Sequence, residues 1–152
     1  MLQNKKLVLG RRAIVLLVED ADNDIELTRI AFEQARFAVD LHVTRDGEHC
    51  MMFLRKQHSY AGSPTPDIIL LDLHMPRMGG MEVLEAINGD PQLRHIPVIV
   101  LTTSTSEGEI LQAYQWRCGG YLIKPVEFSD FARAVQRLED YWFDLVRLPS
   151  QS

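Results

Sequence analysis

The sequence predicts an α/β fold in which an open, doubly wound sheet of five parallel strands is covered by five helices. Several short runs are rich in apolar and β-branched residues, and stretches of helical period separate them. Continuous apolar character, rather than alternation, is typical of strands that are buried on both faces of a parallel sheet. The length of 152 residues suits one domain and is too short for an eight-fold barrel of roughly 250 residues. Right-handed crossovers between parallel neighbours then place helices on both faces.

The predicted strands are short runs rich in β-branched residues and bounded by polar turn residues. They are Ala13–Val18, Val39–Thr44, Ile68–Leu71, Val98–Leu101 and Tyr121–Ile123. The predicted helices begin near Asn23, which can form a capping box with Glu26, then near Asp46, at Gly80, near Glu107 and near Glu127. The first dozen residues and the tail after about Asp140 lie outside these repeats.

Charge and cysteine content narrow the classes of function. Lys and Arg number 16 against 21 Asp and Glu, so the net charge is −5 and the chain is a poor candidate for binding nucleic acid or anionic lipid. Two cysteines are too few for a disulfide framework or a zinc site and fit packed, reduced thiols. No apolar run approaches the ~20 residues that cross a bilayer, and the basic N-terminus has no signal-peptide core, so we expect a cytoplasmic protein.

Polar side chains follow four of the five predicted strands. Glu19 and Asp20 follow the first strand, Asp72 the third, Thr102 the fourth and Lys124 the fifth. Because doubly wound sheets bind ligands at the carboxyl ends of their strands, we expect these side chains to share one cleft. Each has an ordinary explanation alone, as a helix-terminal acid, a turn residue, a strand-end hydroxyl or a solvated lysine. Their joint position at one edge favours a site.

The chemistry of this group points to phosphoryl transfer. Three carboxylates in one cleft repel each other, which a raised pKa or a bound cation relieves, and oxygen ligands on short side chains suit Mg²⁺. A carboxylate beside Mg²⁺ can act as a nucleophile toward phosphorus. The cation, Thr102 and Lys124 would then each contact one phosphoryl oxygen, so Asp72 is predicted to form an aspartyl phosphate.

Four motifs occur in order along the chain: VLLVEDADND (15–24), PDIILLDLHMPRMGG (66–80), PVIVLTTS (97–104) and GYLIKPV (120–126). Together they resemble the receiver domains of response regulators over about residues 12–140. The resemblance implies a flavodoxin-like sheet with the strand order 2-1-3-4-5. Residues 1–11 are then an N-terminal extension, and residues 141–152 are a C-terminal extension that forms part of a dimer interface.

The resemblance also implies roles for the acidic residues. Asp72 matches the phosphoacceptor; Glu19 and Asp20 match the acidic pair, in which Asp20 binds Mg²⁺ directly and Glu19 partly through water. The backbone carbonyl of His74 matches the third protein ligand of the metal. The side chains of His74 and Ser104 occupy positions that modulate dephosphorylation in the family. The ring of His74 itself is either a metal ligand or part of the rim.

Further residues match the parts of the family that respond to phosphorylation. Thr102 resembles the switch hydroxyl that turns toward the phosphoryl group, and Tyr121 resembles the aromatic switch that changes rotamer with it. Lys124 resembles the lysine that bonds the acyl phosphate. Pro125 is expected to follow a cis peptide bond, a form populated only before proline.

The aromatic tail is the next feature with a functional implication. It places Trp142, Phe143 and Val146 beyond the family core, where they either form an interface or fold back on their own domain. This ending and the long loop Gly62–Pro66 are similar to regulators of cyanobacterial phytochrome kinases. Such regulators often pair through the fourth helix, fifth strand and fifth helix, a face that would include Phe131 here.

The favoured hypothesis is a switch without enzymatic output: a histidine kinase, with a phytochrome as the candidate, phosphorylates Asp72, and a homodimer forms. The alternative is a Mg²⁺-dependent phosphohydrolase that uses Asp72 on external substrates. Against it, His74 stands where a second Asp would act as general acid, and no cap insertion is present. An interaction module with an unused pocket is the third hypothesis, and the complete set of site residues argues against it.

Overall fold

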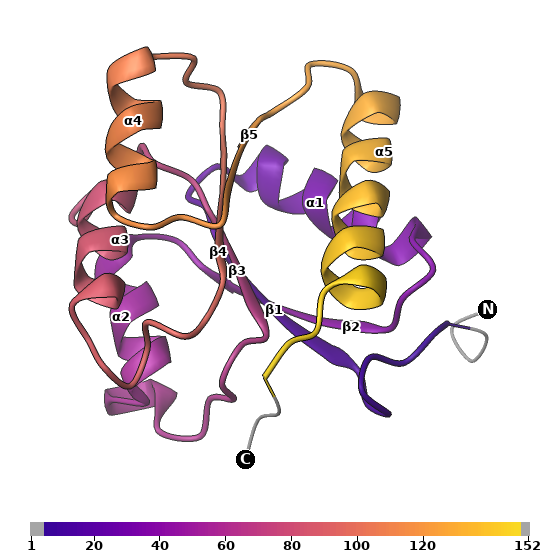
Figure 1. Cartoon of the computed structure of the whole chain (residues 1–152), viewed down its shortest axis with the longest axis horizontal. Helices are drawn as coiled ribbons and strands as arrows, with labels where there is room; N and C mark the ends of the chain where they lie inside the picture. Colours follow the sequence, from indigo (N-terminus) through magenta and orange to yellow (C-terminus); the bar gives the residue numbers. More distant parts are fainter. Residues whose placement is uncertain (1–4, 150–152) are drawn as a thin grey trace.

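A parallel five-stranded sheet in the order β2-β1-β3-β4-β5 forms the centre of the molecule (Figure 1). The computed structural model describes residues 5–149. The strands are β1 (Ala13–Val18), β2 (Val39–Thr44), β3 (Ile68–Leu71), β4 (Val98–Thr102) and β5 (Gly120–Ile123). The predicted fold and strand order are confirmed. The bounds of the first three strands are as predicted, while β4 extends to Thr102 and β5 begins one residue earlier.

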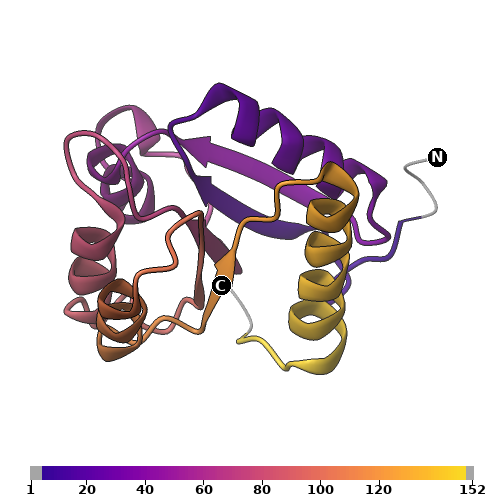
Figure 2. The ribbon, with the colours of Figure 1, turned by 90° about the horizontal axis from the view of Figure 1, so that it is seen from above.

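Five α-helices cover the two faces of the sheet. They are α1 (Asp22–Gln34), α2 (Gly47–Arg55), α3 (Gly80–Asn88), α4 (Glu107–Gln115) and α5 (Phe128–Glu139). Figures 1 and 2 show α2, α3 and α4 on one face, with α1 and α5 side by side on the other. A short 3-10 helix, η2 (His58–Tyr60), follows α2, and a π-helical segment, η3 (Asp140–Leu145), continues α5.

The start of α1 corrects one prediction. The helix begins at Asp22 after the N-cap residue Ala21, and no side chain caps it. The predicted capping box of Asn23 and Glu26 is therefore wrong, because Asn23 already lies within the first helical turn. The predicted start near Asp46 is confirmed, since the Asp46 carboxylate accepts a hydrogen bond of 2.8 Å from the His49 amide at the N-terminus of α2.

The sheet separates two apolar layers. Alternate residues of the same strand point to opposite faces, so β3 sends Ile69 and Leu71 toward α2–α4 and Ile68 and Leu70 toward α1 and α5. All four are buried, which explains why β3 reads as a continuous apolar run. Both cysteines, Cys50 and Cys118, are free and buried in the first of these layers, as expected for packed thiols.

The loop after β3 is anchored to the N-terminus of α2. The buried carboxylate of Asp46 accepts a hydrogen bond of 2.8 Å from Arg77 Nε, and the Gly47 amide donates to the Met78 carbonyl at 2.8 Å. Burial raises the pKa of Asp46, but the hydrogen bonds from His49 and Arg77 outweigh burial, so the net pKa lies below its usual value. These contacts hold the chain that follows Asp72.

The two ends of the described chain pack against the domain. Lys6 forms a parallel bridge with Phe37, whose ring meets that of Phe143 edge to face at a centroid distance of 5.5 Å. Trp142 and Phe143 both pack against the core layer beneath α1 and α5. The described part of the tail therefore folds back on its own domain, the second of the two expectations; residues 150–152 lie outside the described residues.

The burial of Phe131 differs from its predicted place in an interface. Its side chain is buried on the inner face of α5, because the helix turns Phe131, Val135 and Leu138 toward the sheet. Tyr141 and Leu145 are the apolar side chains of the tail that remain exposed, at 53% and 78%. Among the helices of residues 5–149, none is long and apolar enough to cross a membrane.

The buried Glu139 leads to a prediction about how the stability of the protein depends on pH. Glu139 is buried at the end of α5, and within residues 5–149 neither carboxylate oxygen has a hydrogen-bond partner. Burial raises the pKa of Glu139 to about 7 in the folded protein, whereas the unfolded chain has a value of roughly 4.5. Between these two pH values the unfolded chain loses the proton and the folded protein keeps it, so the free energy of unfolding falls as pH rises. We expect Glu139→Gln to raise that free energy by about 2 kcal/mol near pH 8 and to change it little near pH 4.

Denaturant unfolding at both pH values measures the effect of Glu139→Gln. The exposed Glu85, on α3, provides the matched control, and Glu85→Gln should leave the pH dependence as in the wild type. An equal change for Glu139→Gln at both pH values would contradict the prediction.

Candidate phosphoacceptor site

The three acidic residues predicted to share a cleft lie together at the carboxyl edge of the sheet. One carboxylate oxygen from each of Glu19, Asp20 and Asp72 lies within 4.8 Å of the others. Glu19 and Asp20 directly follow β1, and Asp72 directly follows β3, the neighbouring strand. Glu19 and Asp72 are buried whereas Asp20 is exposed, so the cluster opens to solvent on the side of Asp20.

Lys124 supplies the opposing charge. Its side chain, only 10% exposed, donates a hydrogen bond to Glu19 Oε1 and lies 3.0 Å from Asp24 Oδ2 and 3.9 Å from Asp72 Oδ2. β5 delivers this ammonium to the cluster, and the Lys124 amide donates to the Thr102 carbonyl at 2.8 Å. Three clustered carboxylates and one ammonium leave a net negative pocket.

Burial and charge shift the pKa values of this pair. Burial raises the pKa of Glu19, and the hydrogen bond from Lys124 offsets only part of that effect. Burial lowers the pKa of Lys124, but its hydrogen bond to Glu19 and the charges of Glu19 and Asp72 outweigh burial and raise the pKa overall. Lys124 therefore stays protonated.

The donor set fits a magnesium ion. Mg²⁺ prefers oxygen ligands and is held by one or two carboxylates together with waters. Glu19, Asp20 and Asp72 offer oxygens only, and the excess negative charge of the cluster favours a divalent cation. The Asp72 Oδ1 atom also accepts a hydrogen bond of 2.8 Å from the Leu73 amide, which fixes the orientation of this carboxylate.

The predicted switch residues lie on the neighbouring strands β4 and β5. Thr102 is fully buried at the end of β4, and its Oγ1 atom lies 3.4 Å from the Ser104 amide. The Tyr121 hydroxyl donates a hydrogen bond of 3.0 Å to the Ser104 carbonyl. Both side chains therefore contact the loop after β4 through the same residue.

The ring of His74 lies apart from the acidic cluster. Its side chain is 62% exposed, and Nε2 lies 3.2 Å from Glu109 Oε1 on α4. This exposed position fits a residue at the rim of the pocket. The backbone carbonyl of His74 stays the predicted metal contact. The Ser104 hydroxyl donates to the same Glu109 oxygen. This bond, together with the contact with His74, outweighs the effect of burial, which raises the pKa, so the pKa of Glu109 lies below its usual value.

Two residues of this region were not assigned a role from the sequence. Asp24 lies in the first motif, but nothing in that motif indicates that it contacts Lys124, one hundred residues away. Glu109 lies at the third position of α4, where a helix-capping role is the ordinary expectation.

The expected cis peptide bond before Pro125 is wrong. The backbone of residues 5–149 contains no cis peptide bond, so Lys124 and Pro125 are joined in the trans form. Trans is the more stable form of such bonds by about 0.5–1 kcal/mol. With the trans bond in place, the Lys124 side chain donates a hydrogen bond to Glu19.

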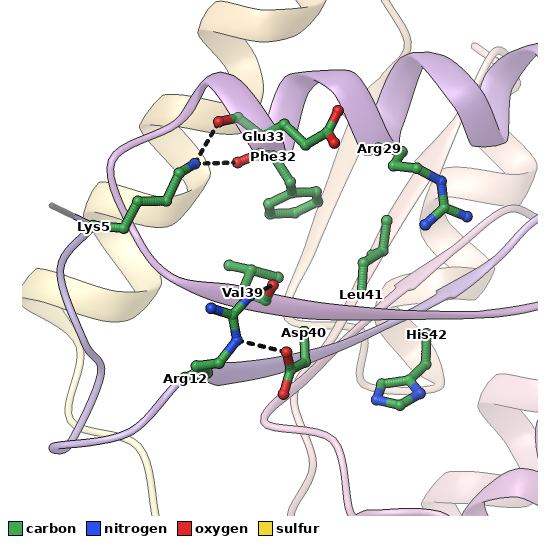
Figure 3. A pocket seen from close by; sticks show the side chains of 9 residues that line it. All are labelled: Lys5, Arg12, Arg29, Phe32, Glu33, Val39, Asp40, Leu41 and His42. Carbon is green, nitrogen blue, oxygen red and sulfur yellow. Dashed lines mark hydrogen bonds and ion pairs between the residues drawn. The ribbon is translucent and has the colours of Figure 1, made fainter. Parts of the chain in front are cut away.

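A separate hollow of about 410 Å³ lies beside β2 and α1 (Figure 3). Two of its cations already have partners: Lys5 bonds the Phe32 and Glu33 carbonyls, and Arg12 Nε lies 2.6 Å from Asp40 Oδ1. None of the predicted site residues lines this hollow. The acidic cluster is therefore separate from this hollow.

Comparisons with known proteins agree with this geometry. The family model described as response regulator receiver domain matches residues 15–146. The chain is 39% identical over 137 residues to the response regulator Rcp1 of Synechocystis, covering 90% of this chain and 93% of that protein. It is 41% identical over 136 residues to a probable methanogenesis regulatory protein, FilR2, of Methanothrix harundinacea, covering 90% and 87%.

Solved structures show the same relationship. The phosphorylated cyanobacterial phytochrome response regulator RcpA superposes with a TM-score of 0.88 at 37% identity, covering 91% of this chain and 99% of that one. The Mn²⁺-bound form of Rcp1 gives a TM-score of 0.85 at 38% identity, with the same coverage. The fold, the acidic cluster and these similarities lead to one conclusion: the chain belongs to the response regulator receiver domain family of two-component systems.

Proposed function

We propose that this protein accepts a phosphoryl group from a histidine kinase on Asp72, with Mg²⁺ bound beside it. The observation that carries the proposal is the meeting of Glu19, Asp20 and Asp72 within 4.8 Å, next to the ammonium of Lys124. Phosphoryl transfer requires mainly positioning and charge neutralisation, and these groups supply both.

In the proposed reaction an Asp72 carboxylate oxygen attacks phosphorus, and the bond between phosphorus and the donor nitrogen breaks, with the nitrogen leaving group taking up a proton. Lys124 would contact one phosphoryl oxygen and the Thr102 hydroxyl another. Mg²⁺ held by Asp20, Asp72, the His74 carbonyl and, partly through water, Glu19 would neutralise developing charge and orient a third oxygen. The acyl phosphate adds a charge of about −1.5 to −2 to the pocket.

The response to phosphorylation is proposed to pass through the face of α4, β5 and α5. Thr102 and Tyr121 both contact Ser104, so movement of either affects the loop that leads into α4. Exposed apolar side chains lie along α4, at the end of β5 and just after it; they are Leu111, Tyr114, Ile123 and Val126. A population shift at this face would alter how well it binds a partner.

A homodimer that uses this face and residues 141–152 is part of the proposal, with Trp142, Phe143 and Val146 at its edge. Phe131, which was predicted to join them, would act from the core behind that face. The similarity to the cyanobacterial phytochrome response regulator RcpA supports a phytochrome as the kinase, and the cytoplasm is the proposed location. The phosphorylation and slow hydrolysis are proposed to be self-catalysed, without enzymatic turnover of external substrates.

Intact-mass spectrometry and light scattering test the proposal together. With acetyl phosphate and Mg²⁺, the wild type should gain one PO₃ unit per chain, and light scattering should report a dimer. Asp20→Ala should lose most of this uptake, because it removes a direct metal ligand. Rapid hydrolysis of small phosphate esters without a stable phosphoprotein would favour the phosphohydrolase instead and would contradict the proposal.

A further inference from the structure

The carboxylate of Glu109 bridges two loops that border the acidic pocket. One loop follows β3 and carries His74 two residues beyond Asp72; the other follows β4 and carries Ser104 two residues beyond Thr102. Glu109 Oε1 lies 3.2 Å from His74 Nε2 and also accepts the hydrogen bond of the Ser104 hydroxyl. A single oxygen atom on α4 thus holds one side chain from each loop.

This arrangement diverts Glu109 from the partner that its position predicts. Residues 106–109 have the sequence Ser-Glu-Gly-Glu, in which the last Glu of a capping box would bond the amide of Ser106. The Ser106 hydroxyl does accept from the Glu109 amide at 3.3 Å, but the Ser106 amide donates to Ser104 Oγ at 3.3 Å instead. The Glu109 carboxylate is therefore engaged with the pocket loops and not with its own helix end.

We propose that Glu109 is a positioning residue that prolongs the phosphorylated state by holding the His74 and Ser104 side chains across the mouth of the pocket. This inference rests on the proposed function of Asp72. Hydrolysis forms a bond from water oxygen to phosphorus and breaks the bond from phosphorus to the Asp72 oxygen; the protons of water pass to phosphate and solvent, and Asp72 returns as a carboxylate.

The bridge acts on the path of that water. In-line attack requires water to approach phosphorus from the side opposite the Asp72 oxygen, and in this proposal that path passes the two loops that Glu109 bridges. While Glu109 holds the His74 ring and the Ser104 hydroxyl, neither is free to orient the attacking water, and the side chains narrow its approach. Without Glu109 both constraints are lost.

The test measures the first-order loss of phosphate from each phosphoprotein after acetyl phosphate has been removed. Glu109→Ala should lose phosphate about three- to tenfold faster than the wild type, which equals about 0.7–1.4 kcal/mol in the activation free energy. Glu109→Gln keeps an acceptor oxygen at the same reach and should restore the lifetime to within about twofold. Glu107→Ala is the matched control, because Glu107 shares the first turn of α4 but is exposed and has no side-chain partner within residues 5–149.

A double-mutant cycle separates positioning from a general effect on the helix. If Glu109 acts through His74, then His74→Ala should change the rate less in the Glu109→Ala background than in the wild type. An unchanged or slower loss in Glu109→Ala, or equal acceleration by Glu107→Ala, would overturn the role of Glu109. Phosphoryl uptake is measured before decay, so a wild type that takes up no phosphate would overturn the proposed function and this inference with it.

Discussion

Replacing Asp72 with Asn is expected to abolish phosphoryl uptake from acetyl phosphate, while the folded protein persists. The amide keeps the shape of the side chain but lacks the negatively charged oxygen that attacks phosphorus. In the structure the Asp72 carboxylate lies close to two other acids and 3.9 Å from Lys124, so its removal cancels both a repulsion and an attraction. We therefore expect the free energy of unfolding to stay within about 1 kcal/mol of the wild type.

Intact-mass spectrometry after incubation with acetyl phosphate and Mg²⁺ measures the uptake of Asp72→Asn, and denaturant unfolding measures its stability. The matched control is Asp90→Asn. Asp90 follows the end of α3 closely, as Asp72 follows the end of β3, but it lies outside the acidic cluster. Uptake by Asp72→Asn at the wild-type level would show that another residue is the acceptor.

Replacing Gly80 with Ala is expected to give the largest loss of stability, about 3 kcal/mol, and to slow phosphoryl uptake several-fold. A Cβ atom at Gly80 would lie 2.3 Å from the Asp72 carbonyl oxygen and 2.7 Å from Leu73 Cα. Both contacts are with backbone, which cannot rotate away as a flexible side chain can. The end of β3 must therefore shift, and it carries the predicted acceptor with it.

Gly108→Ala is the matched control for Gly80→Ala. Gly108 also lies in the first turn of a helix, but its added Cβ would approach no described atom more closely than the Ser106 hydroxyl, at 3.8 Å. Because Ala is a better helix former than Gly, this variant should gain about 0.5–1 kcal/mol. Thermal unfolding compares the two variants; similar melting temperatures would contradict the steric argument.

The three central strands were predictable because burial on both faces gives a continuous apolar run, which can be recognised without knowing the neighbouring segments. Ile68–Leu71 is apolar throughout, and every one of its side chains is buried. The start of α1 was predicted wrongly, because several polar residues in 20–24 could serve as caps and local pattern does not choose among them. The burial of Phe131 was not anticipated for a related reason: an aromatic residue on an amphipathic helix suits the core as well as an interface.

The meeting of Glu19, Asp20 and Asp72 was predictable from topology, since parallel strands end at one edge. The contacts of Asp24 with Lys124 and of Glu109 with His74 were not, because they depend on side-chain directions set by tertiary packing between distant segments. Where the C-terminal tail packs could not be predicted for the same reason. Its aromatic residues could cover their own domain or another, and the edge-to-face contact of Phe143 with Phe37 shows the former for the described residues.

The bond between Lys124 and Glu19 spans 105 positions of the chain, and it has a consequence during synthesis. A nascent polypeptide emerges N-terminus first, so its three acids leave the ribosome well before the lysine that neutralises them. Until translation has passed β5, the partly made domain carries uncompensated charge and an incomplete acceptor. Under the proposed function, a kinase in the same compartment would therefore meet a competent acceptor only after Lys124 has been synthesised.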